Sequence, residues 1–132
     1  MELWAMTEIL RILIVDDEPE IREEMAEYLA GKGYRVIVAG DGPEGLAKFQ
    51  ADPCDLAITD MKMPGMAGAE VIRRLREIAP GLPVVVLTGH YSTPDLEDAR
   101  RAGAGAVLHK PVRLRQLHET LKMLLAGGGD SL

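Results

Sequence analysis

Short apolar runs alternate along the chain with segments in which apolar residues recur at helical spacing. Five runs are rich in β-branched residues and leucine, which is typical of parallel strands covered on both faces. They span residues 9–15, 34–39, 55–59, 83–87 and 106–109. After each run, apolar residues recur at helical spacing, over residues 21–29, 46–49, 71–78, 93–102 and 114–124. The alternation predicts five strand–helix units, and hence an α/β fold with a parallel sheet and helices on both faces.

Turn and capping residues support these boundaries. Pro19 suits the first turn of the first helix, and glycines at 31 and 33 end it. Asp41 and Glu44 have the spacing of a capping box at the start of the second helix. Thr93 has the character of an N-cap for the fourth helix.

Length and composition narrow the class of protein. The 132 residues suit one domain, and a net charge of −6 argues against a partner held mainly by its phosphate backbone. Aromatic residues make up only 4% of the chain, too few for stacking on single-stranded nucleic acid. The single cysteine, Cys54, excludes an internal disulfide and fits a reduced compartment. We therefore predict no direct contact with nucleic acid.

The N-terminal residues and the apolar runs bear on location. Glu2 and Glu8 stand where a signal peptide has a basic region, and no apolar run approaches the roughly 20 residues of a membrane span. These features predict a cytoplasmic protein with no membrane contact.

Charge is unevenly distributed along the chain. Residues 1–60 carry 14 acidic and 5 basic residues, whereas residues 100–122 carry 6 basic residues and one acidic residue. Apart from Lys110, the basic residues of this second segment are expected on or beside the last two helices: Arg100, Arg101, Arg113, Arg115 and Lys122. They form either solvated faces or a docking site for an acidic partner.

Polar residues follow four of the five predicted strands. Asp16 and Asp17 follow the first, Asp60 the third, Thr88 the fourth and Lys110 the fifth. Because ligands bind at the carboxyl ends of strands in such sheets, these residues are expected to converge at one edge. Three neighbouring carboxylates repel one another, and a hard cation such as Mg²⁺ relieves that repulsion. The set provides the nucleophile, metal site and cation that phosphoryl transfer needs.

Four sequence strings carry a resemblance to a known family. They are LIVDDE at 13–18, ITDMKMPGM at 58–66, VVVLTG at 84–89 and HKP at 109–111. In order and spacing they resemble the receiver domain of two-component response regulators, of the single-domain chemotaxis-regulator type. The resemblance implies a flavodoxin-like doubly wound (βα)5 fold with strand order 2-1-3-4-5. It assigns residues 9–125 to the receiver domain, residues 1–8 to an N-terminal extension, and residues 126–132 to a flexible tail or the start of a linker.

The resemblance also implies a metal site and a phosphoacceptor. Asp60 would be the carboxylate nucleophile that takes a phosphoryl group and forms an acyl phosphate. Asp17 would bind Mg²⁺ directly and Asp16 largely through water. Asp60 and the main-chain carbonyl of Lys62 would be the other protein ligands.

Further implied roles concern the transferred group. Thr88 would hydrogen-bond a phosphoryl oxygen. Lys110 would pair with the Asp60 carboxylate before phosphorylation and with the phosphoryl group afterwards. Pro111 would follow a cis peptide bond.

The implied function is a phosphorylation-controlled switch rather than an enzyme, since the domain would catalyse only its own phosphorylation and dephosphorylation. A histidine kinase or a histidine phosphotransfer domain would supply the phosphoryl group. The fourth helix, fifth strand and fifth helix would change conformation, and family members commonly dimerise through that face. An output partner or an output domain would respond to this change.

Two positions depart from the family pattern. Val107 stands where receivers usually carry the tyrosine or phenylalanine that swings inward on activation, and Tyr91 is a candidate substitute. Lys62 lies two residues past Asp60, where its side chain is expected near the phosphoryl group and would shield the acyl phosphate from water.

Two alternative functions use the same features differently. Gly40, Gly42 and Gly45 spell the G-x-G-x-x-G of a dinucleotide-binding turn after a strand. A Mg²⁺-dependent phosphatase with an aspartate nucleophile is the other alternative, but such enzymes place two aspartates two residues apart, whereas Asp16 and Asp17 are adjacent.

Overall fold

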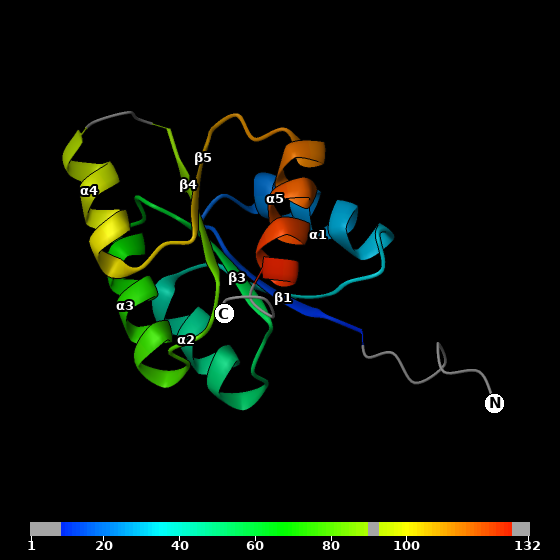
Figure 1. Cartoon of the computed structure of the whole chain (residues 1–132), viewed down its shortest axis with the longest axis horizontal. Helices are drawn as coiled ribbons and strands as arrows, with labels where there is room; N and C mark the ends of the chain where they lie inside the picture. Colours follow the sequence, from blue (N-terminus) through cyan, green and yellow to red (C-terminus); the bar gives the residue numbers. More distant parts are fainter. Residues whose placement is uncertain (1–8, 90–92, 128–132) are drawn as a thin grey trace.

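A computed structural model describes residues 9–89 and 93–127 of the chain (Figure 1). The strands are β1 (Arg11–Val15), β2 (Arg35–Ala39), β3 (Leu56–Asp60), β4 (Val84–Thr88) and β5 (Ala106–His109). The helices are α1 (Pro19–Gly31), α2 (Gly42–Ala51), α3 (Gly68–Ile78), α4 (Thr93–Ala102) and α5 (Leu114–Gly127). All five predicted strand–helix units are present.

The strands form one parallel sheet in the order β2-β1-β3-β4-β5. Helices α1 and α5 cover one face of the sheet, and α2, α3 and α4 cover the other (Figure 1). The predicted doubly wound fold and its strand order are therefore confirmed. Within the described residues, no helix has both the length and the apolar character that crossing a membrane requires.

The sheet separates two apolar cores, because successive residues of a strand point to opposite faces. In β1, Leu13 and Val15 pack with residues of α2, α3 and α4, whereas Ile12 and Ile14 pack with residues of α1 and α5. The central strands β3 and β4 are buried along their whole length. Both cores hold the strand ends in fixed positions, which determines where the polar residues at those ends lie.

The structure places some element boundaries differently from the sequence prediction. Strand β1 begins at Arg11 rather than residue 9, because its register with β2 begins at the Arg11–Arg35 pair. Ile9 and Leu10 are consequently exposed. Asp60 is the last residue of β3 rather than the residue after it, and α3 begins at Gly68, three residues before the apolar stripe.

The second strand–helix unit confirms the predicted cap. The Glu44 backbone N–H donates to Asp41 Oδ1 at 2.8 Å, and Glu44 Oε1 accepts from the backbone N–H of Gly40 at 2.8 Å. Close packing accounts for the two following glycines: a Cβ at Gly42 would lie 2.8 Å from Met66 Sδ, and one at Gly45 would lie 2.7 Å from a methyl group of Val15. The glycine pattern is thus explained by helix packing without a bound nucleotide.

Candidate functional site

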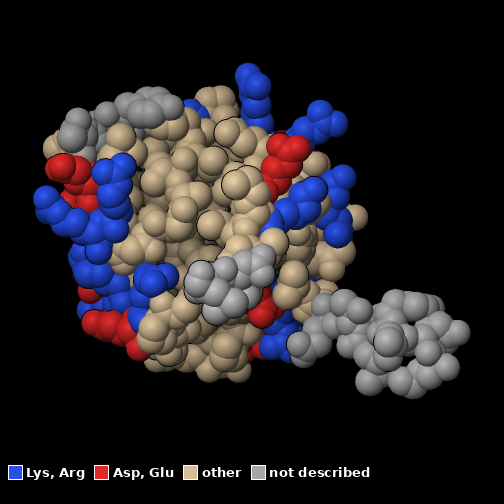
Figure 2. Space-filling view, in the orientation of Figure 1, with Lys and Arg blue, Asp and Glu red and all other residues tan. Residues whose placement is uncertain are grey.

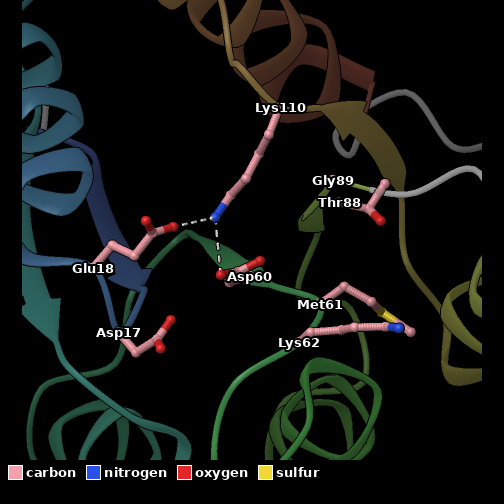
Figure 3. Close-up of a pocket in the computed structure, with 8 residues that line it drawn as sticks. All are labelled: Asp17, Glu18, Asp60, Met61, Lys62, Thr88, Gly89 and Lys110. Atoms are coloured by element: carbon pink, nitrogen blue, oxygen red, sulfur yellow. Dashed lines mark hydrogen bonds and ion pairs between the residues drawn. The ribbon is translucent and has the colours of Figure 1, made fainter.

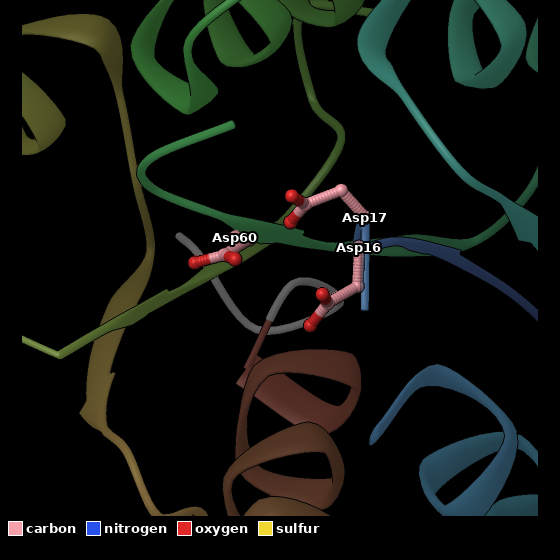
Figure 4. Close-up of side chains that lie close together, drawn as sticks. All are labelled: Asp16, Asp17 and Asp60. Atoms are coloured by element: carbon pink, nitrogen blue, oxygen red, sulfur yellow. The ribbon is translucent and has the colours of Figure 1, made fainter. Parts of the chain in front are cut away.

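Three aspartates meet at the carboxyl edge of the sheet. Asp16 and Asp17 directly follow β1, and Asp60 ends β3, the neighbouring strand. The three offer carboxylate oxygens that all lie within 4.8 Å of one another (Figure 4). Asp16 and Asp60 are buried, whereas Asp17 is exposed. The convergence predicted from the strand ends is therefore observed.

Lys110 reaches this acidic cluster from the residue after β5. Its Nζ lies 2.9 Å from Asp60 Oδ2, 3.0 Å from Glu18 Oε1 and 3.7 Å from Asp16 Oδ2 (Figure 3). The Lys110 backbone N–H donates to the carbonyl of Thr88 at 2.8 Å, which anchors the base of the lysine to the end of β4. The peptide bond between Lys110 and Pro111 is cis, as the family resemblance implies.

Glu18 is a member of this site that sequence reasoning did not assign. Its carboxylate shares the Lys110 ammonium with Asp60, and its backbone N–H donates to Asp16 Oδ1 at 2.9 Å. The signal was present in the string LIVDDE, where Glu18 directly follows the two aspartates.

Burial dominates the electrostatics of the site. Desolvation raises the pKa of Asp60 above its ordinary value, although the hydrogen bond from Lys110 opposes this. Desolvation likewise raises the pKa of Asp16, against the backbone N–H of Glu18 and the charge of Lys110. For Lys110 itself, burial favours the neutral amine, but the hydrogen bonds to Asp60 and Glu18 prevail and raise its pKa. The lysine is therefore a permanent cation in the site.

An open pocket of about 230 Å³ lies over Asp60 (Figure 3). Its wall is formed by Asp17, Glu18, Asp60, Met61, Lys62, Thr88, Gly89 and Lys110. Thr88 is the last residue of β4, on the strand that pairs with β3, and it is buried. The pocket thus brings a carboxylate, a cation and a hydroxyl residue together around a space that can hold a small anion.

The side chain of Lys62 does not take the predicted direction. It lines the pocket, but Figure 3 shows it extending away from Asp60, and its Nζ lies 3.4 Å from Asp95 Oδ2 in α4. The expectation that this ammonium lies beside the phosphoryl position is therefore wrong for this structure. The reason is a competing carboxylate in the first turn of α4, to which no sequence pattern pointed.

Val107 and Tyr91 are the two positions where the family pattern differs. Val107 lies in β5, partly buried, and borders two hollows, one shared with Arg100 of α4 and one with Arg113 before α5. Tyr91 lies outside the described residues, as do the predicted N-terminal extension and most of the predicted tail.

The residues present fit a hard divalent cation. Asp16 Oδ2 is buried and accepts no hydrogen bond from any described residue, so this carboxylate oxygen is available to a cation. The donors are carboxylates, which Mg²⁺ prefers over nitrogen or sulfur ligands. Within residues 9–89 and 93–127, this cluster is the one group of three or more acidic, histidine or cysteine residues placed to hold a metal.

Comparison with known proteins agrees with this site. The family model for the response regulator receiver domain matches residues 12–122. A response regulator receiver protein of Anaeromyxobacter is 44% identical over 107 residues, which is 81% of this chain and 45% of that protein. The transcriptional regulatory protein GlrR of Escherichia coli is 34% identical over 110 residues, 83% of this chain and 25% of that protein. The chain therefore spans less than half of the length of these two relatives.

Solved structures give the same result. A CheY-like receiver domain protein from Methanospirillum hungatei superposes with a TM-score of 0.90 at 34% identity, covering 95% of this chain and all of that one. The chemotaxis protein CheY4 of Vibrio cholerae superposes with a TM-score of 0.85 at 33% identity, covering 89% and 99% of the two chains. From its motifs, its fold and these matches, the chain belongs to the response regulator receiver domain family of two-component signalling proteins.

Proposed function

We propose that this domain is a phosphorylation-controlled switch in which Asp60 accepts a phosphoryl group from the phosphohistidine of a kinase or phosphotransfer partner. The observation that carries the proposal is the placement of Asp60. Its carboxylate lies in an open pocket, 2.9 Å from a lysine ammonium and beside two further aspartates. This arrangement fits a reaction that builds up and then holds negative charge at one point.

The transfer is a single displacement at phosphorus. An oxygen of Asp60 forms a bond to phosphorus while the bond from phosphorus to the partner's imidazole nitrogen breaks, and the electron pair leaves with the imidazole. The product is an acyl phosphate on Asp60. Attack by water on phosphorus later returns the carboxylate and releases inorganic phosphate. Lys110 favours the ionised, nucleophilic form of Asp60 against the effect of burial.

Asp16, Asp17, Asp60 and the main-chain carbonyl of Lys62 would hold Mg²⁺. When bound, the ion neutralises charge on the phosphoryl oxygens and on the acidic cluster. Asp16 Oδ2 supports this assignment, because a buried carboxylate oxygen without a hydrogen bond is costly, and the Lys110 ammonium at 3.7 Å lies beyond hydrogen-bond distance. Asp16 and Asp17 thus supply ligands for the ion and also the negative charge that the ion neutralises.

Thr88 and Lys110 orient the transferred group. Lys110 pairs with Asp60 before transfer and follows the negative charge onto a phosphoryl oxygen after it. The Thr88 hydroxyl donates to another phosphoryl oxygen. The backbone hydrogen bond from Lys110 to Thr88 couples the residue after β5 to the end of β4. This coupling supports a concerted response of the two residues to phosphorylation.

The proposed output surface is formed by α4, β5 and α5. Figure 2 shows largely uncharged side chains over the centre of this side of the molecule, with Lys and Arg at its borders. Val107 borders hollows on both sides of β5, each with an arginine in its wall. This surface suits an output domain, an acidic partner or a second copy of the domain in a phosphorylation-dependent dimer.

The central assignment is tested by incubating the protein with a small phosphodonor and Mg²⁺ and measuring intact mass. The parent is expected to gain one phosphoryl group, and Asp60→Asn none. Asp98→Asn is a matched control, because it removes an exposed aspartate of α4 and is expected to behave as the parent. Equal gain by Asp60→Asn, or no gain by the parent, contradicts the proposal. Repeated turnover of a phosphomonoester would instead indicate a phosphatase.

A further inference from the structure

We infer that Lys62 and Asp95 form a latch that ties the phosphorylation site to α4 and opens when Asp60 is phosphorylated. The inference rests on the proposed function and adds a route from the site to α4 that this chain's own residues provide. Lys62 belongs to the segment after β3 and Asp95 to the first turn of α4. The pair therefore joins two segments that no strand pairing connects.

The geometry of the pair defines its resting state. Lys62 Nζ lies 3.4 Å from Asp95 Oδ2, with 66% of the lysine side chain exposed and only 18% of the aspartate side chain exposed. The carboxylate is thus held in place by α4, while the lysine is a long side chain that reaches it through solvent. Of the two partners, Lys62 is the one free to change position.

A second acidic site, the pocket over Asp60, lies close to the backbone of Lys62. Lys62 lines this pocket, two residues after the phosphoacceptor. In the unphosphorylated protein, Lys110 Nζ lies 2.9 Å from Asp60 Oδ2 and neutralises part of its charge. The pocket therefore attracts a second cation more weakly. The carboxylate of Asp95 is then the better partner.

Phosphorylation reverses this preference. A phosphoryl group brings roughly two negative charges and three acceptor oxygens in place of one carboxylate charge. Asp95 can release the lysine because it lies in the first turn of α4, where the positive end of the helix dipole still stabilises a carboxylate. Lys62 then turns to the phosphoryl group, and α4 loses this ion pair with the β3–α3 segment.

Val107 gives the latch its importance in this chain. The position in β5 that carries a swinging aromatic ring in the family pattern holds a small, partly buried side chain here. A valine side chain is too short to report the state of the site by rotating inward. The ion pair between Lys62 of the β3–α3 segment and Asp95 of α4 connects the site to α4 instead.

Hydrogen exchange of α4 peptides, followed by mass spectrometry, tests the latch. The variants are Lys62→Met, Asp95→Asn and the double variant, each measured before and after treatment with phosphodonor and Mg²⁺. In the resting state, each single variant is expected to speed exchange in α4 by about two- to fivefold, as loss of a partly exposed ion pair allows. The double variant is expected to match the single variants, because both lose the same pair.

After phosphorylation, the parent is expected to show a similar two- to fivefold rise in α4 exchange, and the latch variants no further rise. Lys122→Met is the matched control, because it removes an exposed lysine of α5 and leaves the pair intact. Additive effects of the two single variants, or unchanged α4 exchange in a parent sample that carries the full phosphoryl mass, overturn the latch. Intact mass of the same samples reports the proposed function separately, and no mass gain in the parent overturns that function and the phosphate-driven opening together.

Discussion

Replacing Asp16 by asparagine measures how much the buried charge of Asp16 lowers the stability of the domain. Asp16 Oδ1 accepts a hydrogen bond from the Glu18 N–H at 2.9 Å, which an asparagine oxygen retains. Asp16 Oδ2 accepts none and lies 3.7 Å from Lys110 Nζ. The substitution therefore removes one buried negative charge and changes little else. We expect Asp16→Asn to be more stable than the parent when no metal is bound.

The magnitude follows from burial and linkage. Asp16 has 0% relative exposure, and desolvation raises its pKa, so the native state disfavours the ionised carboxylate at neutral pH. Replacing a buried charge by a neutral group of similar volume is often stabilising by about 1 to 4 kcal/mol, so we expect a gain on the order of 1 kcal/mol for Asp16→Asn. Saturating Mg²⁺ reverses the order, because binding at about 100 times Kd adds roughly 2.7 kcal/mol to a protein with an intact site.

Urea unfolding at pH 7, in EDTA and in Mg²⁺, measures both effects. A pH series gives the sign. A raised native pKa means that the parent loses stability as pH rises from below the unfolded pKa through the native one, so the advantage of Asp16→Asn in EDTA should vanish near pH 3 and grow toward pH 7. Asp98→Asn, which neutralises an exposed aspartate of α4, is the matched control for the substitution itself. A variant less stable than the parent in EDTA at pH 7 would refute the reasoning.

Two further predictions concern buried residues outside the acidic cluster. Gly68→Ala should lower the free energy of unfolding by about 1 to 3 kcal/mol and slow phosphorylation, because a Cβ there would overlap the Asp60 carbonyl oxygen and approach Met61 Cα at 2.8 Å; urea unfolding and the rate of mass gain measure both. Cys54 should react with iodoacetamide at pH 8 about 100-fold more slowly in the folded protein than in urea, because burial raises its pKa to about 11. Equal rates in the two states would contradict the burial of this thiol.

The positions of Asp16, Asp17, Asp60 and Lys110 could be predicted from sequence because topology alone determines them. A parallel sheet brings strand ends to one edge whatever the side chains between them do. The apolar runs therefore predicted the cluster before any distance was known. The start of β1 was less predictable, because Ile9 and Leu10 continue the apolar run but lie before the register with β2 begins.

The direction of Lys62 could not be predicted, because it depends on the position of one α4 carboxylate relative to a loop. Asp95 is 33 positions later in the chain, and no periodicity links the two residues. Glu18 was within reach of sequence reasoning, since it adjoins the aspartate pair, but its contact with Lys110 depends on a side-chain conformation. Backbone topology is encoded in patterns, whereas individual ion pairs are decided by packing.

Because of the ion pairs of Lys110, the site is complete only when the whole domain is folded. Lys110 meets Glu18 across 92 positions of sequence and Asp60 across 50. A nascent chain on the ribosome therefore lacks the complete pocket over Asp60 until β5 has emerged and docked beside β4. Any proteolytic cut that separates the first unit from the last divides the pocket between two fragments. The pocket over Asp60 is thus gained and lost with the fold itself.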